Sequence, residues 1–73
     1  MRLFIVRPAR EGGEEAASYY VAAASIDQAF HLLSGRLPGF DPDRAEWEES
    51  DRYDLSTLHE PRVFASKRAL RSL

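Results

Sequence analysis

No cysteine occurs anywhere in this 73-residue chain, and that absence strongly constrains how the chain can fold. A domain this short buries only about 60% of the surface that it exposes when unfolded. Small domains often make up the difference with disulfides or thiolate zinc sites, and neither can form here. Hydrophobic residues make up 44% of the chain, which is enough for one modest core. We therefore expect one small domain over residues 1–73, held together by packing alone.

The clearest local pattern is a helix over residues 26–34. Ser25 suits the N-cap position, and Gln28 completes a capping box three residues later. Gly35 is typical of the residue that ends a helix. The predicted apolar face is formed by residues at helical spacing, which are Ile26, Ala29, Phe30 and Leu33. A helix this short needs a sheet to pack against.

Three other segments favour β-strands, namely residues 3–6, 18–24 and 62–66. Residues 9–17 connect the first two and contain adjacent glycines, which predicts a flexible hairpin loop. Residues 67–73 are expected to form a tail that is either helical or frayed.

Residues 42–49 are compatible with two structures. Asp41 followed by Pro42 is typical of a helix start, because an N-cap acid precedes a proline at the first helical position. Ala45 and Trp47, however, alternate with glutamates, which indicates a strand. We favour a short turn and then a strand over residues 44–49. Residues 50–61 are expected to be a polar connection.

The resulting order is β-β-α-β-β, which predicts an α+β domain of two layers: a mainly antiparallel sheet with one helix packed on one face. One helix can cover only one face, yet the strands carry apolar residues on both. Phe4, Tyr20 and Phe64 are therefore predicted to lie on an open face used for self-association or partner binding. The alternative is that residues 50–61 or the tail fold over that face.

Charge is unevenly distributed along the chain. Residues 41–60 contain eight acidic residues and two arginines, whereas residues 61–73 contain only basic charges. An acidic face of this kind can dock on a basic groove that normally holds DNA or RNA, since complementary charge speeds encounter and fixes orientation. The alternative is ordinary solvated surface. The candidate partner-binding residues are Glu46, Trp47, Glu48, Glu49, Asp51, Asp54, Phe4, Tyr20 and Phe64.

No arrangement of residues supports catalysis. Ser56, His59 and Asp54 could be assembled into a triad, but the sequence lacks a nucleophile elbow and a glycine run for an oxyanion hole. Asp41 and Asp43 resemble the opening of a calcium loop without its required glycine. We therefore predict no catalytic residues, no metal site and no cofactor. The net charge of −2 argues against direct nucleic-acid binding. No membrane or signal segment is evident, so the expected location is the cytoplasm.

The order of elements, the strand-to-helix passage from Val21 to Leu33 and the closing residues 63–67 resemble small phage and mobile-element proteins. These include anti-CRISPR inhibitors of type I interference complexes. The resemblance lies in architecture rather than in a motif, so no functional residue is carried over. It implies a non-catalytic inhibitor that binds a protein or ribonucleoprotein complex. The alternative is a small homodimeric accessory or regulatory domain.

Overall fold

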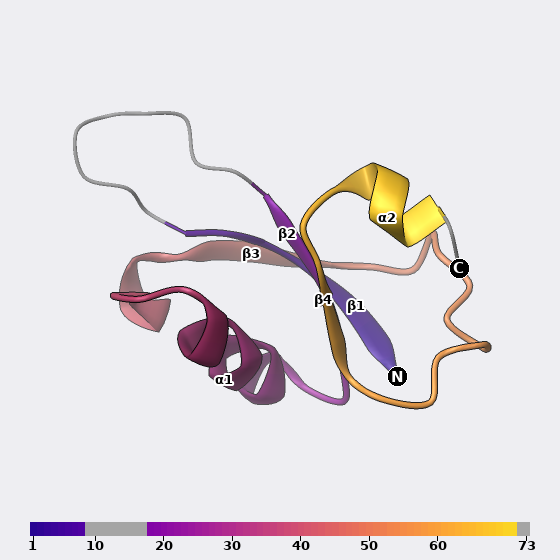
Figure 1. Cartoon of the computed structure of the whole chain (residues 1–73), viewed down its shortest axis with the longest axis horizontal. Helices are drawn as coiled ribbons and strands as arrows, with labels where there is room; N and C mark the ends of the chain where they lie inside the picture. Colours follow the sequence, from indigo (N-terminus) through magenta and orange to yellow (C-terminus); the bar gives the residue numbers. More distant parts are fainter. Residues whose placement is uncertain (9–17, 72–73) are drawn as a thin grey trace.

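The computed structural model describes residues 1–8 and 18–71. These residues form an antiparallel sheet and two α-helices (Figure 1), which confirms the α+β class. In chain order the elements are β1 (Arg2–Arg7), β2 (Tyr19–Ala23), α1 (Ile26–Arg36), the 3-10 helix η1 (Pro42–Arg44), β3 (Glu46–Ser50), β4 (Arg62–Phe64) and α2 (Lys67–Arg71). The flexible loop predicted for residues 9–17 lies outside the described residues.

The four strands are arranged in the order β3-β1-β2-β4, and every neighbouring pair is antiparallel. The two inner strands are the most apolar segments of the chain. Val6 of β1, for example, lies opposite Tyr19 of β2 and opposite Trp47 of β3. The edges of the sheet are formed by the charged strand β3 and by β4, which is only three residues long.

Helix α1 covers one face of the sheet. Ala29 and Leu33 are fully buried against side chains of β1 and β2, and Phe30 packs at the margin against Phe40 with ring centroids 5.8 Å apart. The predicted N-cap at Ser25 is confirmed, but the reciprocal bond of the capping box goes to the residue before Ser25. The Ser25 hydroxyl accepts a hydrogen bond from the Gln28 amide, and the Gln28 side chain accepts one from the backbone of residue 24.

The predicted helix stop at Gly35 is wrong. Helix α1 continues through Arg36, and the amide of Leu37 donates to the Leu33 carbonyl at 2.7 Å. A glycine stop requires a left-handed backbone, and among the described residues only Gly39 has a positive φ, of 76°. Helix α1 therefore ends at Arg36, two residues beyond the predicted end at residue 34, and Gly39 lies after the helix has ended.

The second face of the sheet is also covered, so the prediction of an open aromatic face is wrong. Tyr20 and Phe64 do lie on this face, but they are only 7% and 3% exposed because Leu70 of α2 packs over them. Phe4 lies on the α1 face and is fully buried. The alternative expectation is confirmed. The residues that close the second cluster around its edge are Ile5, Tyr53, Leu55 and Leu58.

The helix-start signal and the strand signal in residues 42–49 both correspond to structure, first a 3-10 turn and then a strand. The Asp41 side chain accepts a hydrogen bond from the Asp43 amide at 3.0 Å, and Pro42 begins the single 3-10 turn η1. The alternating segment then forms β3, as favoured from its period of two. The turn brings Trp47 into register with Val6 of β1.

Candidate protein-binding edge

Strand β3 carries four of the nine predicted partner-binding residues, and it is open to solvent along its outer side. It pairs with β1 alone. None of its five residues is buried, in contrast to the inner strands. Its outer backbone groups are therefore without a strand partner among the described residues, and acidic side chains project from it. We call Glu46, Trp47, Glu48 and Glu49 the β3 edge.

The β3 edge presents different groups on its two faces. Trp47 lies opposite Val6 and therefore on the α1 face, as does Glu49. Glu46 and Glu48 alternate onto the α2 face. The acids therefore flank the tryptophan along the strand and lie on both sides of the sheet.

Trp47 is anchored at one side and exposed at the other. Its ring meets the buried ring of Phe4 edge-on, with centroids 5.9 Å apart and planes at 68°. This geometry is the favoured one for an aromatic pair. The residue nevertheless remains 47% exposed, the largest exposure of an aromatic residue among those described. The result is a positioned aromatic surface with no covering element.

Two arginines of β1 partly neutralise the glutamates. Arg2 forms an ion pair with Glu49, and its guanidinium also lies 5.2 Å from the centroid of the Phe4 ring. The hydrogen bond to Glu49 raises the pKa of Arg2. Arg7 approaches Glu48 at 3.5 Å, between Nη2 and Oε1. All of these charged groups are solvent-exposed, so the ion pairs orient the side chains more than they stabilise the fold.

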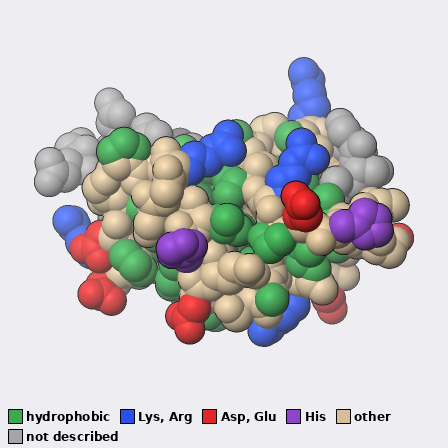
Figure 2. Space-filling model, turned by 60° about the horizontal axis from the view of Figure 1, so that its bottom comes forward, with side chains coloured by type: hydrophobic (Ala, Val, Ile, Leu, Met, Phe, Trp, Pro, Cys, Tyr) green, Lys and Arg blue, Asp and Glu red, His purple; other side chains and the backbone are tan. Residues whose placement is uncertain are grey.

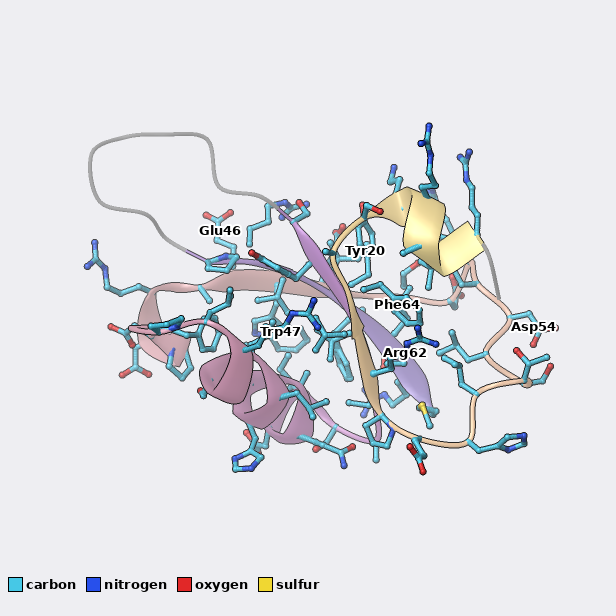
Figure 3. All side chains as sticks on the ribbon, viewed as in Figure 1. Tyr20, Glu46, Trp47, Asp54, Arg62 and Phe64 are labelled. Atoms are coloured by element: carbon cyan, nitrogen blue, oxygen red, sulfur yellow. The ribbon has the colours of Figure 1, made fainter. Side chains whose placement is uncertain are left out.

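The acidic segment does not form one compact patch. Figure 3 shows Glu46 and Asp54 toward opposite ends of the molecule, whose longest dimension is 38 Å. Asp54 belongs to the connection after β3, where its side chain accepts a hydrogen bond from the Ser56 amide at 2.9 Å. That bond lowers the pKa of Asp54. Asp51 lies nearer the end of β3, beside Ser50 in a surface hollow. The structure therefore places Glu46 to Glu49 on one strand. Asp54 lies beyond the end of that strand, along the same hollow as Glu49 and far from Glu46.

Ser56, His59 and Asp54 do not form the hydrogen bonds of a triad. The bond between Ser56 and Asp54 uses the Ser56 backbone, and no bond links His59 to either residue. Figure 2 shows the two histidines, coloured purple, well separated on one face. Among residues 1–8 and 18–71, no three His, Asp or Glu side chains come close enough to hold a metal ion. The helices in that same part of the chain are too short to cross a bilayer.

A groove along the opposite edge strand is a feature that sequence reasoning missed. It follows β4 between the two helices, and we call it the β4 groove. It is lined by Leu32, Gly35, Arg36, Pro61, Arg62, Val63, Phe64, Ala65 and Ala69. These residues lie up to 37 positions apart, so only the run of small and basic residues around β4 could have hinted at it.

No protein-family model, curated protein or solved structure matches this chain.

Proposed function

We propose that this chain is a non-catalytic protein-binding domain whose binding surface is the β3 edge. The observation that carries the proposal is Trp47, an aromatic residue 47% exposed on an edge strand and flanked by carboxylates. Trp47 is held in place by its edge-on contact with Phe4, so a partner can cover it without first ordering it.

The chemistry of the β3 edge favours a basic protein partner. Tryptophan is enriched among the residues that dominate binding energy at interfaces. The flanking carboxylates would steer a positively charged surface toward it and fix the orientation. Charged side chains on an edge strand also oppose indiscriminate pairing with other strands, which favours a selective contact over aggregation.

In its narrower form, the proposal is that the partner's basic surface otherwise binds nucleic acid. Glu46, Glu48 and Glu49 would then occupy phosphate-binding positions of a protein or ribonucleoprotein complex and exclude its DNA or RNA. An inhibitor of the anti-CRISPR type would act in this way. Exposed carboxylates spaced along an extended strand support this form of the proposal.

The test compares matched variants as immobilised baits in a lysate of the cells that make the protein. One variant is Trp47→Ala, and a second carries Glu46→Lys with Glu48→Lys. The control carries Asp27→Lys with Glu60→Lys, which changes the charge equally at exposed sites away from β3. We expect a basic protein to bind the wild type and the control, to be lost from both β3 variants, and to be displaced by added duplex DNA.

Equal capture by the wild type and both β3 variants would refute the proposal. Capture that depends on Trp47 but is insensitive to DNA would retain the protein-binding function and remove the narrower form.

A further inference from the structure

The two edges of the sheet are complementary to one another, and we propose that the β4 groove binds the β3 edge of a second copy of this chain. The inference shares the β3 edge with the proposed function but adds a new surface, the β4 groove. It can fail without the proposed function failing, because variants of the groove leave β3 unchanged.

Strand direction permits this pairing. Strand β3 is antiparallel to β1, β1 to β2, and β2 to β4, so β3 runs antiparallel to β4 across the sheet. A second copy displaced along the sheet would therefore place its β3 antiparallel to β4 of the first. Its α1 would remain on the same face. Such strand addition to an open edge is a recurring mode of protein recognition.

The groove has room for the incoming side chains. Strand β4 pairs with β2 on one side only, and its other side opens into the β4 groove. Gly35 lines that groove from α1, and a Cβ placed on it would meet no atom within 4 Å. Ala65 and Ala69 line the groove with similarly small side chains. In Figure 2, hydrophobic side chains gather near the centre of the molecule, with lysine or arginine side chains above them.

The faces of the two edges match in polarity. Trp47 lies on the α1 face, where the groove presents Val63 and the Leu32 side of α1. An incoming indole on that face would meet an apolar wall. On the α2 face, Glu48 of the second copy would approach Arg62, which lies 5.1 Å from the ring centroid of Phe64.

The arginines of the groove form no ion pair within the described part of the chain. No carboxylate of residues 1–8 or 18–71 lies within ion-pair distance of Arg36 or Arg62. The β3 edge carries three glutamates. The β3 edge and the β4 groove therefore carry opposite charges, and β3 and β4 already run antiparallel. We infer from both features that β3 of a second copy occupies the β4 groove.

The contact is heterologous, because different surfaces of the two copies meet. Each added copy leaves one free β3 edge and one free β4 groove at the ends of the assembly. The assembly therefore grows without a fixed end, unless the copies close into a ring. A three-residue β4 and screened surface charges make each contact weak and sensitive to salt. Self-association would also occupy β3 and compete with any other partner for it.

The experiment is sedimentation velocity on the full chain, from about 10 µM to about 1 mM, at low salt and at about 1 M salt, where the Debye length falls to about 3 Å. We expect the mean mass of the wild type to rise with concentration at low salt and to return toward the monomer at high salt. Glu48→Arg and Arg62→Glu should each remain monomeric alone. An equimolar mixture of the two should associate, because the intact β4 groove of the first meets the intact β3 edge of the second.

A second pair of variants tests the groove itself. Gly35→Trp fills it and should abolish association, whereas Gly35→Ala adds only a methyl group and should retain it. Gly35→Trp should also still capture any protein that binds the wild-type β3 edge, which separates this inference from the proposed function. A wild type that stays monomeric throughout at low salt overturns the inference. So does association that survives Gly35→Trp, or a variant mixture that stays monomeric.

Discussion

Replacing Leu70 with alanine tests whether α2 closes the second face of the sheet. Leu70 is 1% exposed and is the one buried residue of the five-residue α2. A helix of that length is not stable by itself, so its position depends on this side chain. Burial of Tyr20 and Phe64 depends in turn on α2.

The expected loss can be estimated from the burial. Leucine-to-alanine changes at fully buried sites lower the free energy of unfolding by about 2–5 kcal/mol, depending on how far the site collapses. A domain of this size has about 4–10 kcal/mol in total. Helix α2 lies at the end of the described chain and can detach instead of leaving a cavity. We therefore expect the lower part of the range, about 2–3 kcal/mol.

The measurement is urea unfolding followed by far-UV circular dichroism, together with binding of the dye ANS to the native state. Leu70→Ala should lower the unfolding midpoint, and detachment of α2 would raise ANS fluorescence because Tyr20 and Phe64 become accessible. Arg71→Ala is the matched control on the same helix, since Arg71 is exposed, and should stay within about 0.5 kcal/mol of the wild type. A Leu70→Ala protein as stable as this control would show that α2 does not cover the face in solution.

Two further predictions concern backbone and pH. Gly35→Ala should raise the free energy of unfolding by about 0.5–1 kcal/mol, and with it the melting temperature, because Gly35 is helical with open space around it. Gly39→Ala should lower the melting temperature, because φ at Gly39 is +76°. The lowered pKa of Asp54 contributes stability that is present above its unfolded pKa and lost as pH falls through the folded value. Asp54→Asn should therefore weaken the acid dependence of the unfolding midpoint, and an unchanged acid limb would contradict this origin.

Features encoded by neighbouring residues could be predicted from the sequence. The start of α1 depends on Ser25 and Gln28, which lie three positions apart, and both the turn and the strand around residues 42–49 depend on local signals. The end of α1 could not be predicted from Gly35, because this glycine is helical and the chain leaves the helix at Leu37, which has an extended backbone. The positive φ of Gly39 follows the end of the helix.

Features that depend on distant residues could not be predicted. Leu55 and Leu58 pack against the second core cluster from a connection that is mostly polar, and α2 adds only Leu70 and is too short to show a helical period. The candidate residues Glu46 to Glu49 were identified from composition and alternation. The distance between Glu46 and Asp54 depends on where β3 ends, and the β4 groove depends on three elements meeting in space.

The central position of β1 has a consequence for the order of folding. Its pairing with β2 joins residues 13 to 21 positions apart, but its pairing with β3 joins residues 39 to 47 positions apart. Closing so long a loop is entropically unfavourable until other contacts reduce the effective separation. Packing of α1 on the β1–β2 hairpin would shorten that separation. Strand β3 would therefore join late. During that interval β1 would present an unpaired backbone edge beside the apolar side chains of residues 3–6, open to pairing with another chain.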